Sequence, residues 1–295
     1  MAAKKRRSYT ALVYFLTFAI FFAIIGGGAW LVLDRYILTH EEEETSSVAD
    51  EVLVPTKEDC VTTLFVLSNE NKDISGILLA RLMPTETALK LVPVPPSTAY
   101  GDSDFEATFK SGGVSSLITA IGTEYDVLID KYMVLNDKGF IALTDILGGT
   151  AYTIPCDMYY KDSEGNLTSF TQGLTDYNMT GEDLLKIIRY PLYEQGLSLN
   201  NKLVGDVVTE LLNNACVQRT DIMTVAKTIY LNLFNSSDTN ISAADWNEYE
   251  GWIRYILSNN QKPVMYKSPF GDWVEGKFVP SYTGVTDIKT YFAIG

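Results

Sequence analysis

Residues 61–94 read VTTLFVLSNENKDISGILLARLMPTETALKLVPV, three apolar runs separated by polar residues. The runs are Val61–Leu67, Gly76–Leu82 and Ala88–Val94, and the first two each contain four consecutive apolar side chains. Uninterrupted apolar runs of this length are typical of strands that are buried on both faces. Pro84–Thr87 has the composition of a turn, which predicts a hairpin between the second and third strands. We therefore expect a sheet that is covered on both sides.

Downstream of this stretch, helical and strand periodicity alternate. A loop near Gly101–Gly113 leads to a helical segment, Val114–Ile121, which Gly122 is expected to end. A strand, a helix closed by Gly148-Gly149 and a second strand are expected next, at Tyr132–Leu135, Lys138–Leu147 and Thr150–Pro155. This alternation is typical of an α/β domain.

The last third of the chain is mostly helical by its pattern. Thr180, followed by Glu182 and Asp183, is a typical helix start, and Pro191 is expected to stop that helix after Tyr190. Three more amphipathic helices are predicted at Asn200–Asn214, Arg219–Phe234 and Ser242–Leu257.

Near the end of the chain, Pro263–Lys267 and Val274–Pro280 are expected to form a hairpin around Gly271. No linker interrupts residues 57–295. We therefore predict one three-layer αβα domain with a mixed sheet over this range, preceded by a single transmembrane helix.

The transmembrane prediction comes from the first 56 residues. Residues 1–8 form a basic tail, residues 9–33 are almost uninterruptedly apolar, and residues 34–56 form an acidic stalk. About 25 helical residues at 1.5 Å each exceed a hydrocarbon core of roughly 30 Å. The charge asymmetry places the N-terminus in the cytoplasm and residues 57–295 outside the cell, on a single-pass anchor. A cleaved signal peptide is the alternative, although the apolar run is longer than such peptides usually carry.

Charge and residue counts exclude several classes of function. Residues 36–295 retain 18 of the 23 basic and 36 of the 37 acidic side chains, a charge of −18, which argues against nucleic acid as a partner. His40, the single histidine, lies in the stalk, so histidine-dependent catalysis and histidine-ligated zinc are excluded. Cys60, Cys156 and Cys216 allow one disulfide or three free thiols.

Several segments, in order, resemble the LytR-CpsA-Psr family. The best stretch is NDKGF at 136–140, TDILGG at 144–149 and YTIPCDM at 152–158; FTQG at 170–173, MTGEDLLKIIRY at 179–190 and TNISAADW at 239–246 follow. The resemblance covers about 60–295. It implies a membrane-anchored protein that transfers an anionic glycopolymer from a polyprenyl-diphosphate carrier onto the wall of Gram-positive bacteria.

The residues that carry this chemistry in the family are largely missing. Its R-S-D-T is here Asp73–Gly76, its I-P-R-D-T is Val94–Thr98, and its G-R-x-x-R-Q is Gly196–Asn201. Where the family has a basic residue after the Tyr132 strand position, this chain has Val134. Of the two arginines in the family's R-x-R, it has only Arg189. Two linked phosphates need guanidinium groups or a divalent cation to neutralise them. The sequence therefore predicts no catalytic residue, no metal site and no cofactor.

The remaining candidates are few. Arg189, Lys110 and Lys131 could contact a phosphate, although Arg189 could equally cap a helix C-terminus or pair with a carboxylate. Asp157 and Asp162 are a weaker candidate pair for acid–base chemistry or cation binding. The resemblance also implies a lipid tube, for which we name the apolar residues Ile77, Leu79, Leu91, Ile118, Ile141 and Leu185.

Three functions follow. The first is a catalytically degenerate family member that binds a polyprenyl-linked precursor or a partner enzyme in cell-envelope assembly. The second is an active, divergent phosphotransferase, the only case that requires Mg²⁺. The third is an interaction module in which the tube has collapsed and the acidic surface meets a basic partner.

Overall fold

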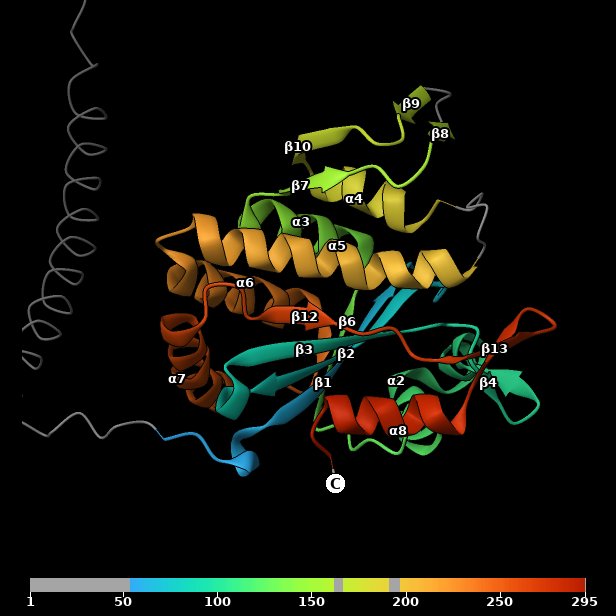
Figure 1. Cartoon of the computed structure of the whole chain (residues 1–295), viewed down its shortest axis with the longest axis horizontal. Helices are drawn as coiled ribbons and strands as arrows, with labels where there is room; N and C mark the ends of the chain where they lie inside the picture. The colour runs from blue at the N-terminus through green and yellow to red at the C-terminus, as the bar shows by residue number, and fades with distance from the viewer. Residues whose placement is uncertain (1–53, 162–166, 191–196, 295) are drawn as a thin grey trace, which may run out of the picture. The chain divides into compact units, whose positions relative to one another are not determined.

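The computed structural model describes residues 54–161, 167–190 and 197–294 (Figure 1). The predicted tail, the predicted membrane span and nearly all of the predicted stalk lie outside these residues, so they stay predictions. Within the described residues, no helix combines the length and the apolar character needed to cross a bilayer. Val54–Gly295 forms one compact unit.

The centre of this unit is a six-stranded mixed sheet in the order β11-β6-β1-β2-β3-β12. Its strands are β1 (Val61–Ser68), β2 (Ile74–Met83), β3 (Ala88–Val94), β6 (Lys131–Leu135), β11 (Asp238–Thr239) and β12 (Val264–Tyr266). The pairs β1–β2 and β2–β3 are antiparallel, whereas β6 runs parallel to β1 and β12 runs parallel to β3. The three predicted strands and the hairpin at Pro84 are confirmed.

Helices cover both faces of the sheet, which confirms the three-layer architecture. They are α2 (Phe105–Tyr125), α3 (Asp137–Leu147), α4 (Gly181–Ile188), α5 (Leu197–Gln218), α6 (Ile222–Ser236), α7 (Ala243–Asn259) and α8 (Tyr282–Tyr291). Figure 1 shows α2 and α8 on one side of the sheet and α3, α5 and α6 on the other. Alternate residues of each strand point to opposite layers. In β1, Leu64 and Val66 therefore pack with α2 and α8, whereas Leu67 packs with α3 and α4.

Two predicted helix starts are confirmed in detail. The Thr180 and Ser242 hydroxyls accept hydrogen bonds from the backbone N–H groups of Asp183 and Asp245, completing capping boxes for α4 and α7. At the start of α4, a Cβ on Gly181 would lie 2.7 Å from the Cα of Ile141. Glycine at this position therefore allows α4 to pack closely against α3.

Helix α2 is longer than predicted. It begins after Asp104, whose carboxylate accepts from the N–H of Ala107, and it continues past Gly122 to Asp126 in the left-handed conformation. Gly113, with φ 68° and ψ −165°, kinks the helix without ending it. The prediction that this helix starts at Val114 was therefore wrong, because Gly113 marks a kink inside the helix and not a loop before it.

The predicted C-terminal hairpin is also corrected. Val264–Tyr266 does not pair with Val274–Pro280; instead it joins the main sheet as β12, beside β3. The hairpin consists of β13 (Gly271–Val274) and β14 (Lys277–Pro280), and α8 follows it. Peripheral pairs are formed by β4 (Ala99–Tyr100) with β5 (Ser103–Asp104), β7 (Thr150–Thr153) with β10 (Thr175–Met179), and β8 (Met158–Lys161) with β9 (Leu167–Phe170).

Candidate functional site: an apolar cavity and its polar mouth

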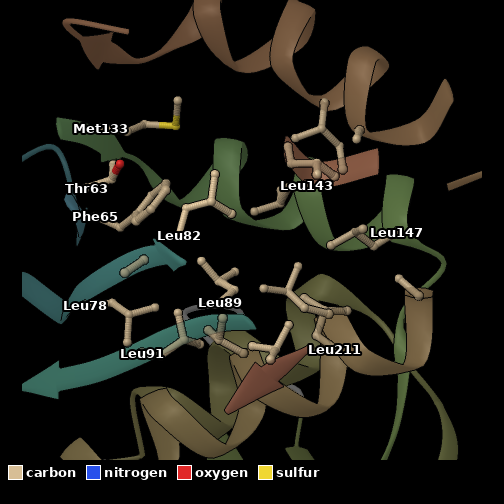
Figure 2. A pocket seen from close by; sticks show the side chains of 18 of the residues that line it. Thr63, Phe65, Leu78, Leu82, Leu89, Leu91, Met133, Leu143, Leu147 and Leu211 are labelled. Atoms are coloured by element: carbon tan, nitrogen blue, oxygen red, sulfur yellow. The ribbon is translucent and has the colours of Figure 1, made fainter. Parts of the chain in front are cut away.

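A cavity of about 410 Å³ lies between the sheet and the helices of the α3–α7 layer. Figure 2 shows side chains of the strands, including Phe65, Leu78 and Leu91, and of the helices, including Leu143 and Leu211, pointing into the same space. The wall is almost wholly apolar because these strands carry apolar residues on both faces. Such a cavity suits a long hydrocarbon chain.

The few polar atoms of the wall carry no charge. Cys216 lines the cavity, and burial raises the pKa of its thiol, which keeps the group neutral. Neither it nor Cys60 or Cys156 forms a disulfide. Tyr230 and Trp246, also in the wall, stack with ring centroids 4.7 Å apart. The residues that line the cavity therefore include no charged side chain to pair with an anion.

Five charged side chains and one serine gather next to one end of the cavity wall, in what we call the mouth cluster: Asp73, Ser75, Glu106, Lys110, Asp137 and Arg189. Three residues of the cavity wall, Gly76, Leu135 and Ile188, lie within two positions of Ser75, Asp137 and Arg189 in the chain. The cluster joins the start of β2, the first two turns of α2, the first turn of α3 and the end of α4.

Arg189 is the centre of this cluster. Its Nη1 and Nη2 donate to the two carboxylate oxygens of Asp137 at 2.5 and 2.6 Å, and its Nε donates to Ser75 Oγ at 2.7 Å. Arg189 is also the C-cap residue of α4. Both roles considered for it without a ligand, capping a helix C-terminus and pairing with a carboxylate, are present in the structure.

Lys110 meets the same cluster from α2. Its Nζ lies 2.7 Å from an oxygen of Asp73 and 2.8 Å from Glu106. The pKa of Asp73 is lowered chiefly by the hydrogen bonds that it accepts from Lys110 and Asn69. The nearby charges of Lys110 and Arg189 add to this effect, which outweighs desolvation. The hydrogen bonds that Lys110 donates to Asp73 and Glu106 raise the pKa of Lys110. Two of the three predicted phosphate-binding cations thus lie near one another, and both are paired with carboxylates.

Lys131, the third predicted cation, lies elsewhere. It begins β6, which runs parallel to β1, and it pairs with Thr63 near the start of β1, whereas Arg189 contacts the edge where β1 ends. Lys131 Nζ forms an ion pair with Asp245 of α7 at 2.7 Å. Lys131 therefore does not lie with Arg189, because Lys131 is at the edge of the sheet where β1 begins and Arg189 contacts Ser75 at the edge where β1 ends.

The ion pair with Lys131 gives Asp245 a measurable role. Burial raises the pKa of Asp245, but hydrogen bonds from Lys131 and Ser242 outweigh this effect and hold the pKa at about 2. A carboxylate whose pKa is lowered on folding stabilises the fold above its unfolded pKa of about 4, and this contribution disappears as the pH falls towards 2. We expect Asp245→Asn to cost about 1 kcal/mol at pH 7 and progressively less below pH 4, as measured by thermal melting.

Asp183 provides the control for this prediction. It fills the same capping-box position in α4 but belongs to no ion pair among the residues described here. Asp183→Asn is expected to cost less than Asp245→Asn at pH 7. A cost of Asp245→Asn that stayed constant from pH 7 to pH 2.5 would contradict the assigned ion pair.

The predicted lipid-tube residues divide between the two layers. Leu91 lines the cavity. Ile77, Leu79 and Ile118 pack in the opposite layer with α2, and Ile141 and Leu185 pack between α3 and α4 without reaching the cavity wall. These five assignments are corrected. Strand β2 is apolar on both faces, so its sequence does not show that Leu78 and Ala80, rather than Ile77 and Leu79, face the cavity.

The structure describes only one of the two acidic candidates, so their pairing stays a prediction. Asp157 accepts a hydrogen bond from the backbone N–H of Gln172 at 2.8 Å, which closes a loop, and Asp162 lies outside the described residues. Across residues 54–161, 167–190 and 197–294, no group of three or more His, Cys, Asp and Glu side chains is arranged to hold a metal ion.

Sequence reasoning missed Ser75, Glu106 and Asp137 as parts of the site. Glu106 and Lys110 have the i, i+4 spacing of a helical ion pair, but the helix was expected to start later. Asp137 follows Asn136, the N-cap of α3, a position where an acidic residue is usually explained by the helix dipole alone.

The sequence that builds these layers matches a known family. The LytR_cpsA_psr family model matches residues 84–285, more than half of the chain. The chain belongs to the LytR-CpsA-Psr family. The match includes α2, α3 and α4, and therefore Lys110, Asp137 and Arg189, whereas Asp73 and Ser75 precede it.

Individual relatives agree with this assignment. The polyisoprenyl-teichoic acid–peptidoglycan teichoic acid transferase TagU of Bacillus cereus is 24% identical over 275 residues, covering 79% of this chain and 88% of TagU. The crystal structure of a putative transcription regulator from Eubacterium siraeum covers 85% of this chain and 98% of its own, with a TM-score of 0.75 and 18% identity. The crystal structure of Bacillus subtilis TagV covers 80% of this chain and 97% of its own, with a TM-score of 0.65 and 17% identity. The two structures show the shared fold.

Proposed function

We propose that this member of the LytR-CpsA-Psr family binds a polyprenyl lipid of cell-envelope assembly and does not transfer a glycopolymer. The observation that carries the proposal is the composition of the mouth cluster. At the end of an apolar cavity, three carboxylates accompany two cations. The predicted anchor at residues 9–33 would hold the domain outside the cell, at the membrane that contains such lipids.

The cavity supports the lipid part of the proposal. Each Å² of apolar surface that a ligand removes from water contributes about 25 cal/mol, and this wall offers the ligand almost only apolar groups. The name of the relative TagU refers to a polyisoprenyl-linked substrate. An open cavity also weighs against the third function that we considered, an interaction module with a collapsed tube.

The charges support the absence of transfer. Transfer of a phosphate ester requires cations placed where negative charge develops in the transition state. Arg189 is neutralised by Asp137, and Lys110 is shared between Asp73 and Glu106. Lys72 and Lys138 neighbour the cluster in the sequence, so the surface around it is not wholly acidic. Negative charge that develops on the reacting oxygens in the transition state would therefore gain little stabilisation from this arrangement.

The test is a paired binding and turnover measurement on the purified domain. Native mass spectrometry with polyprenyl monophosphate is expected to show a one-to-one complex. Incubation with a polyprenyl-diphosphate-linked glycan, peptidoglycan fragments and Mg²⁺ is expected to release no polyprenyl phosphate above a protein-free control. Release above the control would identify an active phosphotransferase, and the absence of any lipid complex would favour the interaction module.

A further inference from the structure

We infer that Asp137 limits the charge of the headgroup that the mouth cluster accepts, so that the preferred ligand is a polyprenyl alcohol or monophosphate rather than a diphosphate. The inference deepens the proposed function and depends on it for the lipid part of the ligand. Its basis is that Asp137 accepts hydrogen bonds from two nitrogens of the Arg189 guanidinium group.

Asp137 is held firmly in position. It is the first residue of α3, directly after the N-cap Asn136, whose side chain accepts from the N–H of Gly139. Arg189 follows α4, and its backbone N–H donates to the Leu185 carbonyl. Since α4 packs closely on α3 at Gly181, the two ends approach as parts of one packed unit. The ion pair is thus built into the helix packing.

Asp137 and Ser75 together use the binding surface of the guanidinium group. An arginine has five N–H donors, and it grips a phosphate through two parallel ones. The end-on pair, Nη1 and Nη2, is taken by the two oxygens of Asp137, and Nε, one half of the side-on pair, is taken by Ser75. A phosphate can therefore bind Arg189 in a bidentate way only by displacing Asp137 or Ser75.

The charge of the cluster acts in the same direction. Asp73, Glu106 and Asp137 against Lys110 and Arg189 give a net charge of −1. The Arg189 and Asp137 side chains are 25% and 36% exposed, so water screens the pair only in part. A diphosphate would meet this negative charge at the end of the cavity, whereas an alcohol would meet no net repulsion.

The experiment compares four ligands: a polyprenyl alcohol, its monophosphate, its diphosphate, and inorganic diphosphate, which needs no cavity. Asp137→Ala, and the more conservative Asp137→Asn, are expected to raise the affinity for both diphosphates about tenfold and to change the affinity for the alcohol less than about twofold. Asp137→Ala combined with Arg189→Ala is expected to lose the gain. Asp102→Ala removes an exposed carboxylate outside the cluster and is expected to change none of the four affinities.

Three results would overturn the inference: no gain in either Asp137 variant, a gain that survives the loss of Arg189, or an equal gain in Asp102→Ala. If Asp137 only ties α3 to α4, its variants would lower the melting temperature without changing diphosphate binding. A chain that binds none of the three polyprenyl compounds would contradict the proposed function. The affinity of the Asp137 variants for inorganic diphosphate, which needs no cavity, would still test the role of Asp137.

Discussion

Ala80→Phe is expected to weaken the binding of a polyprenyl lipid by at least about 100-fold while leaving the domain folded. Ala80 lies on β2 between Leu78 and Leu82, which also line the cavity. A phenyl ring at this position would fill part of the 410 Å³ that the lipid would occupy. Because the ring enters a cavity rather than a packed core, little overpacking is expected.

The measurement is a fluorescence titration with polyprenyl monophosphate, together with thermal melting of each variant. Ala244→Phe is the matched control, since Ala244 is exposed at the start of α7. Unchanged lipid affinity in a folded Ala80→Phe protein would show that the ligand does not use this cavity. An equal loss in Ala244→Phe would show that the effect is not specific to the cavity.

Leu79→Ala is expected to lower the free energy of unfolding by about 3–5 kcal/mol, and Leu78→Ala by roughly 1–2 kcal/mol less. Leu79 is fully buried in the layer of α2 and α8. Leu78, which is 7% exposed, has the cavity on one side, so it makes fewer packing contacts. The two side chains are chemically identical and adjacent, which makes each the control for the other.

Urea unfolding of both variants measures the difference. Equal costs, or a larger cost for Leu78→Ala, would mean that the two faces of β2 are packed alike. The cavity would then not be a property of the folded domain in solution, and the proposed lipid site would lose its physical basis.

The sequence was sufficient for the layers of the fold but not for which residues face which layer. Val61–Leu67 and Gly76–Leu82 are apolar on both faces, and this identified them as central strands. The same property concealed their orientation, because a period-2 pattern is readable only when one face is polar. Ile77 and Leu79 were therefore assigned to the cavity instead of Leu78 and Ala80.

Long-range pairing explains the other differences. Val264–Tyr266 lies near β13 and β14 in the chain, which favoured a local hairpin, but it pairs in parallel with β3, about 175 residues earlier. Lys131 and Arg189 looked equivalent as isolated cations, and only the direction of β6 relative to β1 separates them. The shortage of cations at the site could be predicted because residue types are visible in a sequence. The partner of the remaining arginine, Asp137, required coordinates.

The outermost strands have a consequence for how copies of the domain behave at high density. Both are very short: β11 has two residues and β12 has three, and the Tyr291 hydroxyl donates to the Met265 carbonyl of β12. A foreign chain therefore finds few free backbone groups to extend, and extension of this kind is how aggregates and fibrils commonly begin. Copies of this domain that are held close together, for example by a tether, are therefore not expected to associate through β11 or β12.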